Sequence, residues 1–354
     1  MPVYNTFQLE YGIGLEATWG TGVATGANVP VGGVIKLPLT NKPDFTSGIE
    51  IISSPKALGV PWRRTEEYYQ GIKSPGVTLE IDLDVNTIAP FLYSLFNGVD
   101  EGEATTYTKV YNIYRDTGAT VSIPDYAAKS AAVNTTPLLF SLIKNTGVAD
   151  EGFRLVSGAV RSITISSNEN EPMKASIEVI ARDLETGYDA TGNTFTLSTT
   201  NSTPILHQNL GFEIDTVATK LNSFSITYTN NMIPKHQANT TADAQIANQY
   251  VVGLWEVTGS ASFVWSGDNA TIIDKWIAGT DMLFEIFNPG TSNSDGASDT
   301  AGDFYLKSNI RLTAAPLVGE DEQTLEITFD GVDDGTNPAA YVTLADGVNY
   351  GWPT

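Results

Sequence analysis

Short segments in which apolar and polar residues alternate recur along the chain, and this period of two is typical of strands with one buried face. The clearest is 77–84, where Val, Leu, Ile and Leu alternate with Thr, Glu, Asp and Asp. The same pattern predicts strands over Phe45–Ile52, 221–229 and 256–265. Because these segments are rich in β-branched and aromatic residues and are bounded by turn formers, the sequence predicts a mostly β fold.

Two pairs of alternating segments predict antiparallel hairpins. Residues 160–165 and 175–181 flank a polar stretch that contains Asn and Pro as turn formers. Residues 310–313 and 324–329 bracket an acidic connector in the same way. Both pairs have the length and pattern of hairpins with one apolar face.

Two stretches, about 86–97 and about 269–278, have apolar residues at helical spacing. Asn or Thr is the expected N-cap of the first helix, and Asp or Asn that of the second. Gly98 and Gly279 follow the last periodic residues, as expected for helix C-termini. Each helix therefore has both of its ends marked in the sequence.

The two helices have similar surroundings in the chain. Each follows an alternating strand, and each of those strands follows a long polar segment, about 53–75 in one case and about 231–253 in the other. Loops of this length are uncommon in compact domains and usually have a function. We therefore predict two units, 1–190 and 200–354, of which each carries one helix and one long loop. The alternative is one larger β domain whose helices match by coincidence.

Composition limits the possible functions. The chain has 354 residues, 19 Lys and Arg against 41 Asp and Glu, a net charge of -22 and no cysteine. This charge repels phosphate backbones, which argues against general nucleic-acid binding. Cysteine nucleophiles, thiolate metal sites and disulfides are excluded. No apolar run is long enough to span a bilayer and the N-terminal residues lack a signal-peptide pattern, so we expect neither a membrane anchor nor a cleaved signal.

Catalytic signatures are scarce. The two histidines, His207 and His236, stand in polar surroundings outside any metal-binding or nucleophile motif. Gly12–Gly14 and Gly32–Gly33 are not followed by a helix pattern, so we interpret them as turns rather than phosphate-binding loops. Carboxylates are too plentiful for any pair to stand out. We expect no enzyme activity, no catalytic residue and no cofactor.

Two acidic clusters, 293–299 and 330–335, could offer oxygen ligands to calcium. Neither has the ligand spacing or the terminal Glu of an EF-hand. Solvated turns are the preferred interpretation, and we predict no metal site.

The long loops carry side chains that are enriched at the centres of protein interfaces. One interpretation is a loop that folds onto its own core. The other is a contact arm that docks on a neighbouring subunit. The candidate contact residues are Trp62, Arg63, Arg64, Tyr68 and Tyr69 in the first loop, and Lys235 and Tyr250 in the second.

The segment 12–21, which contains the pattern G-x-E-x-T-x-G-T, resembles the start of tail tube proteins of long-tailed bacteriophages. The order of strand, long loop, strand, helix and hairpin is similar to theirs, and 158–165 with 175–179 resembles their late hairpin. The resemblance implies β-sandwich or barrel units, each with one short flanking helix and a long extended loop. It also implies a virion protein, made in the host cytoplasm, that assembles into stacked rings around a channel for DNA.

In that family the long loop reaches the adjacent ring and sheets join between subunits. The resemblance therefore makes 53–75 and 231–253 the expected ring-stacking arms. The chain is about twice as long as one tube unit, so three chains would form a pseudo-six-fold ring if both halves are tube units, and six would be needed otherwise. We favour three. The implied partners are tape measure, terminator and baseplate proteins, a sheath if the tail is contractile, and DNA that passes without specific binding.

A second function class stays open at this point. A β-sandwich adhesion or carbohydrate-binding module would use exposed tryptophans as stacking platforms. The candidates are Trp19, Trp255, Trp265 and Trp352.

Overall fold

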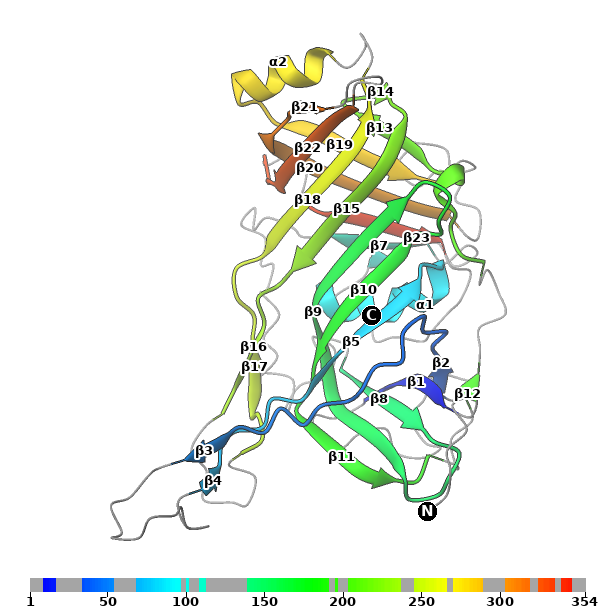
Figure 1. The fold of residues 1–354 in the computed structure, drawn as a ribbon, viewed down its shortest axis with the longest axis vertical. Helices are drawn as coiled ribbons and strands as arrows, with labels where there is room; N and C mark the ends of the chain where they lie inside the picture. The colour runs from blue at the N-terminus through cyan, green and yellow to red at the C-terminus, as the bar shows by residue number, and fades with distance from the viewer. Residues whose placement is uncertain are drawn as a thin grey trace.

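The computed structural model shows a mostly β protein (Figure 1). It describes residues 9–16, 34–53, 68–96, 100–101, 108–112, 139–190, 195–196, 203–236, 245–265, 270–288, 303–318, 324–334 and 339–345. Among these residues the helices are α1 (Val85–Phe96) and α2 (Ala270–Ala278), and His207–Asn209 form a 3-10 turn.

The strands are β1 (Glu10–Leu15), β2 (Val34–Lys36), β3 (Ile51–Ser53), β4 (Tyr68–Gln70), β5 (Gly76–Asp82), β6 (Asp100–Glu101), β7 (Thr108–Asn112), β8 (Phe140–Asn145), β9 (Gly152–Asn168), β10 (Lys174–Ile180), β11 (Asp183–Tyr188), β12 (Phe195–Thr196), β13 (Gly211–Ile214), β14 (Val217–Ala218), β15 (Leu221–Thr229), β16 (Ile233–Lys235), β17 (Gln249–Val251), β18 (Glu256–Val264), β19 (Met282–Phe287), β20 (Asp303–Ala314), β21 (Leu317–Val318), β22 (Thr324–Gly331) and β23 (Tyr341–Ala345).

Most of the predicted strands are confirmed. Segment 221–229 forms β15, residues 77–82 of segment 77–84 lie in β5, and residues 256–264 of segment 256–265 form β18. The prediction of one strand over Phe45–Ile52 is wrong, because only the end of this segment enters β3 and Thr46 makes a single bridge to Gly76. Beyond Thr46, the segment hydrogen-bonds to the residues that precede β5, through Gly48 to Ser74 and through Glu50 to Ile72 and Gly71.

Two series of antiparallel strands have the same order of pairing. The first strand set is β1–β8–β9–β10–β5, and the second strand set is β13–β19–β20–β22–β18. Both predicted hairpins are confirmed within them, as β9–β10 and β20–β22. Each hairpin has a bulge at which one residue is inserted, Arg161 in β9 and Thr313 in β20.

The two sets are joined by one ladder. β15 pairs antiparallel with β9 from Ser223 opposite Asn168 to Thr229 opposite Ser162, and β15 also pairs with β18. The sheet therefore continues from β5 through β10, β9, β15, β18 and β22 to β20 (Figure 1). One hydrophobic core cluster includes residues from both sets, so the two halves share a core.

Helix α1 starts at Val85, and its N-cap is Asp84. The Asp84 Oδ1 accepts hydrogen bonds from the backbone N–H groups of Asn86 (3.0 Å) and Thr87 (2.8 Å). The prediction that Asn or Thr caps this helix was therefore wrong. Every residue of α1 is buried, because the helix contacts β9 as well as β7 and β23. It is enclosed by strands rather than flanking them.

The glycines of the segment 12–14 lie inside β1, so their interpretation as a turn was wrong. A Cβ atom on Gly12 would stand 2.3 Å from Val34 Cγ1 and 2.7 Å from Phe195 Cε1. Glycine is needed here because two neighbouring side chains lie directly against the backbone. Gly32 and Gly33 lie outside the described residues.

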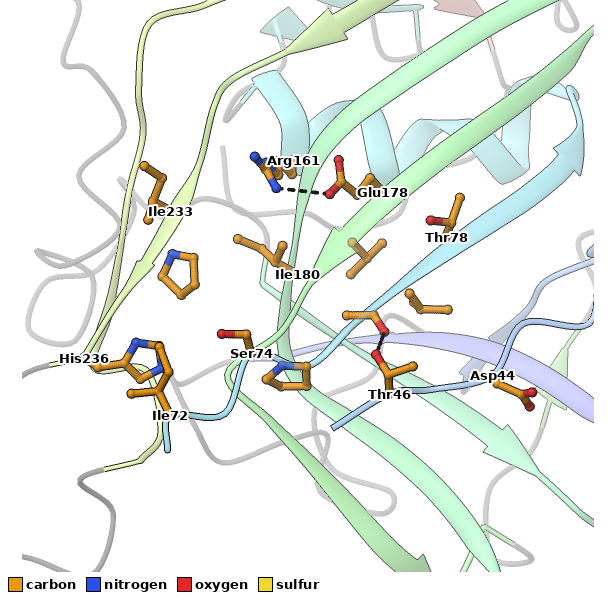
Figure 2. A pocket seen from close by; sticks show the side chains of 15 residues that line it. Asp44, Thr46, Ile72, Ser74, Thr78, Arg161, Glu178, Ile180, Ile233 and His236 are labelled. Carbon is orange, nitrogen blue, oxygen red and sulfur yellow. Dashed lines mark hydrogen bonds and ion pairs between the residues drawn. The ribbon is translucent and has the colours of Figure 1, made fainter. Parts of the chain in front are cut away.

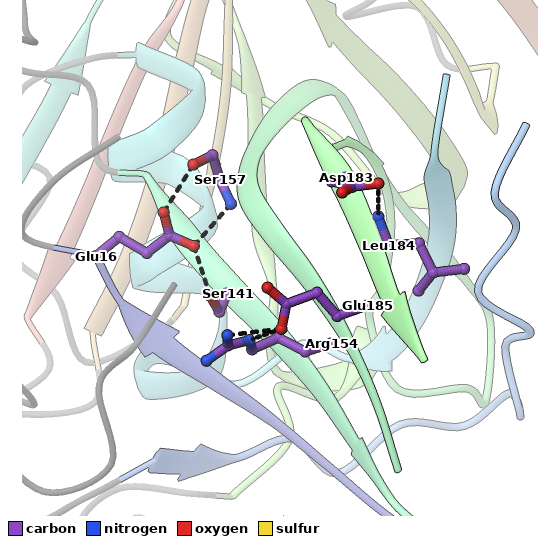
Figure 3. A network of polar contacts seen from close by, with 7 residues as sticks. All are labelled: Glu16, Ser141, Arg154, Ser157, Asp183, Leu184 and Glu185. Carbon is purple, nitrogen blue, oxygen red and sulfur yellow. Dashed lines mark hydrogen bonds and ion pairs between the residues drawn. The ribbon is translucent and has the colours of Figure 1, made fainter. Parts of the chain in front are cut away.

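Glu16 fixes the end of β1 to β8 and β9 (Figure 3). Its carboxylate accepts hydrogen bonds from Ser141 Oγ, from the Ser157 backbone N–H (2.7 Å) and from Ser157 Oγ (2.8 Å). Ser157 has a φ of 50°, a left-handed conformation that these contacts hold in place. Burial raises the pKa of Glu16 above its ordinary value, although the serine hydrogen bonds oppose this shift.

Asp84→Ala is expected to lower the free energy of unfolding by about 1–2 kcal/mol, because two backbone N–H groups of a buried helix lose their acceptor. Urea denaturation of the purified protein measures this loss. Asp84→Asn keeps an acceptor and should retain most of the stability. Equal losses in the two variants would assign the effect to charge instead of capping.

Glu16→Gln is expected to change the pH dependence of stability. Because the pKa of Glu16 is raised on folding, the folded wild type binds more protons than the unfolded chain, and the stability from this group is lost as pH rises. Thermal unfolding should be measured from about pH 4 to about pH 7. The wild type should lose stability relative to the variant as the pH rises past the ordinary glutamate pKa near 4.3. A difference that is constant with pH would contradict this expectation.

Candidate assembly surfaces

Two ribbons extend from the body of the molecule at the places where the sequence predicts long loops. The first arm, residues 51–75, begins with β3 and returns through β4, and the second arm, residues 231–253, contains β16 and β17. The described residues of each arm include a two-stranded antiparallel ladder, 51–53 with 68–70 in the first and 233–235 with 249–251 in the second. In Figure 1, β16 and β17 run down the left side of the molecule, and β3 and β4 lie farther to the lower left.

The two arms are hydrogen-bonded to each other although they lie far apart in the sequence. The backbone N–H of Lys73 donates to the Gln245 carbonyl (2.8 Å), and His236 Nε2 donates to the Lys73 carbonyl (2.9 Å). The Gln245 side chain donates to the Gln70 carbonyl (3.3 Å). The described parts of the arms therefore form one projection, and His236 has a structural role in it.

Tyr250 anchors the second arm to the body. Its side chain is 2% exposed, and its hydroxyl donates to the Ser157 carbonyl (2.7 Å). It packs in a small cluster with Leu139, Ala159, Met232 and Ala247. This placement corrects the predicted role of Tyr250, because a buried side chain has no surface left for another chain.

The other predicted contact residues are placed differently. Lys235 is exposed on β16. The backbones of Tyr68 and Tyr69 pair with Ser53 and Ile52 in the first arm. Trp62, Arg63 and Arg64 lie outside the described residues.

Exposed large apolar side chains are concentrated on the arms and on α2. On the arms and at their bases, those among the described residues are Ile49, Ile51, Ile52, Ile72, Ile233, Val251 and Leu254. On α2 they are Trp276 and Ile277. Clustered apolar surface of this kind marks sites of protein interaction.

An open pocket of about 630 Å³ lies between the bases of the arms and the main sheet (Figure 2). Ile72, Ile180 and Ile233 line its apolar part. On the sheet side, Arg161 Nη1 is ion-paired with Glu178 Oε1 at 3.2 Å. Because this pair is satisfied internally, the pocket offers no free charge from Arg161 or Glu178 to a small ionic ligand.

The face of the main sheet opposite the core is covered with hydroxyl and carboxylate side chains, and we call it the polar face. The core side carries alternating apolar residues such as Phe224, Ile226 and Tyr228 of β15. One row of paired residues across the polar face reads Glu80, Ser176, Thr164, Thr227, Thr258, Asp330 and Arg311. The joint between the strand sets lies within this row, where Thr164 Oγ1 and Thr227 Oγ1 are 2.9 Å apart.

Three cations on or beside the polar face pair with carboxylates. Arg161 pairs with Glu178, Lys174 with Glu171 and Arg311 with Asp281. The Glu171 carboxylate raises the pKa of Lys174 above its ordinary value, through a hydrogen bond. These three cations are thus held in ion pairs on a face that also carries several carboxylates.

His207 is held within the chain by two contacts. Its Nδ1 lies 2.9 Å from Ser167 Oγ, and its Nε2 donates to the Leu221 carbonyl (3.0 Å). Across the described part of the chain, no group of three or more His, Asp or Glu residues could hold a metal ion. The predicted acidic cluster 293–299 falls outside that part.

The tryptophans of the carbohydrate-binding alternative do not form an exposed platform where they are described. Trp255 and Trp265 are partly buried and pack against the core. Trp19 and Trp352 lie outside the described residues. Neither helix of the described structure is long and apolar enough to cross a membrane.

Sequence reasoning missed two features of these surfaces. The hydrogen bonds between the arms join residues with no local signal, since His236 and Gln245 belong to an otherwise ordinary polar segment. The sequence drew attention to Glu16, because it is the acidic residue of the segment that resembles tube proteins. Its hydrogen bonds to Ser141 and Ser157 could not be predicted, because these serines belong to distant strands.

Comparison with known proteins agrees with this architecture. A sequence model of the family described as phage tail tube protein matches residues 6–332. No curated protein matches the chain. The match covers nearly the whole length of the chain, including both strand sets and both arms, and the chain therefore belongs to the phage tail tube protein family.

Proposed function

We propose that this tail tube protein assembles into stacked rings of three chains, and that the rings enclose the channel through which DNA passes into the host. The observation that carries the proposal is the head-to-tail joint of the two strand sets, in which β15 of one set extends the sheet of the other at β9. Self-assembly, rather than catalysis, is then the activity of the protein, and the tail of the virion is its location.

The proposed number of chains rests on repetition within one chain. The strand sets share their order of pairing, and each has a bulge at the same point of its hairpin. In each set an arm directly precedes the strand that ends the pairing order, β5 or β18. We infer two tube units, 1–190 and 200–354. A head-to-tail interface that repeats with a closing rotation generates a ring. Six units arranged in this way require three chains.

The arms are the proposed contacts between rings. The exposed Ile51, Ile52 and Ile233 of the arms would leave water on contact with another ring, which is favourable by roughly 25 cal/mol per Å² of apolar area buried. Trp62, Arg63, Arg64, Tyr68, Tyr69 and Lys235 are the proposed stacking residues. Tyr250 is left out of this set because it is buried in its own chain.

The polar face is the proposed wall of the channel. Protein binding to DNA depends largely on cations that neutralise phosphates and release counterions. On this face Arg161, Lys174 and Arg311 are held by carboxylates. The row of paired residues described above contains Ser176, Thr164, Thr227 and Thr258. DNA would then slide past the wall without specific binding. Tape measure, terminator and baseplate proteins, and a sheath in a contractile tail, are the proposed partners at the ends and outside of the tube.

Electron microscopy of the purified protein over a concentration and salt series tests this proposal. We expect rings or hollow tubes, and native mass spectrometry of single rings should give three chains. Rings of six chains would overturn the two-unit interpretation. A protein that stays monomeric, even with tail initiator proteins present, would contradict the proposed function.

Simultaneous replacement of Trp62, Arg63 and Arg64 by Ala is expected to prevent tube growth while leaving the chain folded, because the proposed stacking contacts lose their anchors. Sedimentation of assembled tubes measures the effect. The matched control is Lys36→Ala, which removes a cation far from the arms, at β2, where it pairs with Glu10 (2.8 Å). Normal tube growth by the triple variant would remove the first arm from the stacking contact.

A further inference from the structure

Helix α2 presents apolar surface that its own chain does not cover. Ile272 is its one buried residue, whereas the side chains of Trp276 and Ile277 are 37% and 76% exposed. Gly279, which has a φ of 66°, directly follows the last residue of the helix. In Figure 1, α2 lies at the extreme upper end of the molecule, beyond the second strand set.

Helix α1 has the corresponding position in the first strand set. It follows β5, as α2 follows β18, and β5 and β18 have equivalent pairings in the two sets. Phe96 stands two residues before Gly98, and Ile277 stands two residues before Gly279. Ile277 is therefore the counterpart of Phe96.

Phe96 is covered by residues from the second half of the chain. Its ring stacks on Trp255, with centroids 5.5 Å apart and planes at 19°, and lies 5.8 Å from the ring of Tyr228. These contacts leave Phe96 only 8% exposed. The difference between Phe96 and Ile277 is that a further unit follows the first helix within the chain, whereas no such unit follows the second among the described residues.

We infer that the exposed face of α2, formed by Trp276 and Ile277, docks on the first half of a second copy of this chain. This inference rests on the proposed function, since it supplies the joint that connects one chain to the next in the ring. The first half of the second copy would cover α2 in the same way as the second half of the chain covers α1.

The register of the strands identifies the surface on the second copy. Leu39 bridges to Ile81 in the first half, and Leu221 pairs with Phe263 in the second. These pairs make Ile81 the equivalent of Phe263. Trp255 stands eight residues before Phe263, and Lys73 stands eight residues before Ile81, so Lys73 has the position that corresponds to Trp255. Lys73 is partly exposed, and its neighbour Ile72 is 46% exposed. The base of the first arm thus offers an aliphatic surface to Ile277.

The strand edge beside α2 agrees with this arrangement. In β9, the residues that follow the bulge at Arg161 pair with β10 on one side and with β15 on the other. In β20 and β21, the residues that follow the bulge at Thr313 pair with β22, and no described strand covers their other edge. An open edge next to an uncovered apolar helix is suited to pairing with another chain.

Ile277→Lys tests the inference, because it places a charge in the proposed joint but leaves a monomer intact. The position is exposed, and a cation in the last turn of a helix is compatible with the helix dipole. We expect the concentration needed for ring formation to rise about tenfold or more. Leu206→Lys is the matched control, since Leu206 is 38% exposed and lies outside the arms and α2, and it should leave ring formation unchanged. Circular dichroism and thermal unfolding confirm that both variants fold.

The outcomes separate this inference from the proposed function. Rings of the wild type together with monomers of Ile277→Lys support both. Normal rings of Ile277→Lys overturn the docking of α2 but leave the tail tube function standing. Failure of the wild type to assemble, with initiator proteins present, contradicts the function and the inference together.

Cross-linking gives a second, positive test, because the chain has no cysteine of its own. A Lys73→Cys and Ile277→Cys double variant treated with a short bismaleimide should form a covalent ladder that ends at three chains. Each single variant should stay monomeric on a denaturing gel. A dimer from Ile277→Cys alone would mean that α2 packs on another α2, and a product linked within one chain would mean that its own residues cover the helix; either result overturns the inference.

Discussion

The antiparallel pairing of β9 with β15 joins the two strand sets, and the remaining architecture depends on it. A shift of one residue in this ladder would turn Phe224, Ile226 and Tyr228 toward the polar face and would bury the serines and threonines between them. The ladder therefore has one acceptable register. That register makes the polar face continuous, closes the second strand set over α1 and brings the bases of the two arms together.

The enclosure of α1 shows what the joint contributes to packing. Isolated, its apolar side chains would cover only part of a sheet surface, as those of α2 do. With the second strand set in place, Phe96 lies against Trp255 and Tyr228 and every residue of the helix is buried. The two equivalent helices of one chain thus differ: α1 is covered by other residues of the chain, and α2 is not covered by the described residues. The uncovered helix is the direct structural argument for a neighbouring chain.

Exposed apolar surface in the described structure is divided between two locations. The arms carry it away from the body in one direction, and α2 carries it at the opposite end of the strand sets (Figure 1). A polymer of stacked rings needs two kinds of contact, one within the ring and one between rings. Two separate apolar surfaces, together with an extended polar face that lies between them, fit this need. The paired cations of the polar face also fit a wall past which DNA moves freely.

The sequence by itself determined the local elements and the broad class of the protein. Alternation of period two located β5, β15, β18 and both hairpins, because half-buried strands impose this pattern directly on the chain. Segments 12–21 and 158–179 pointed to the tail tube family, and the order of elements pointed to two long arms. The tertiary structure decided what depends on residues far apart in the chain. Asp84 caps α1, and Glu16 accepts hydrogen bonds from two distant serines. Tyr250 is buried, and the two arms are hydrogen-bonded to each other. Pairing partners, burial and the contacts of polar groups are set by the packing of distant strands, and no local pattern in the sequence encodes them.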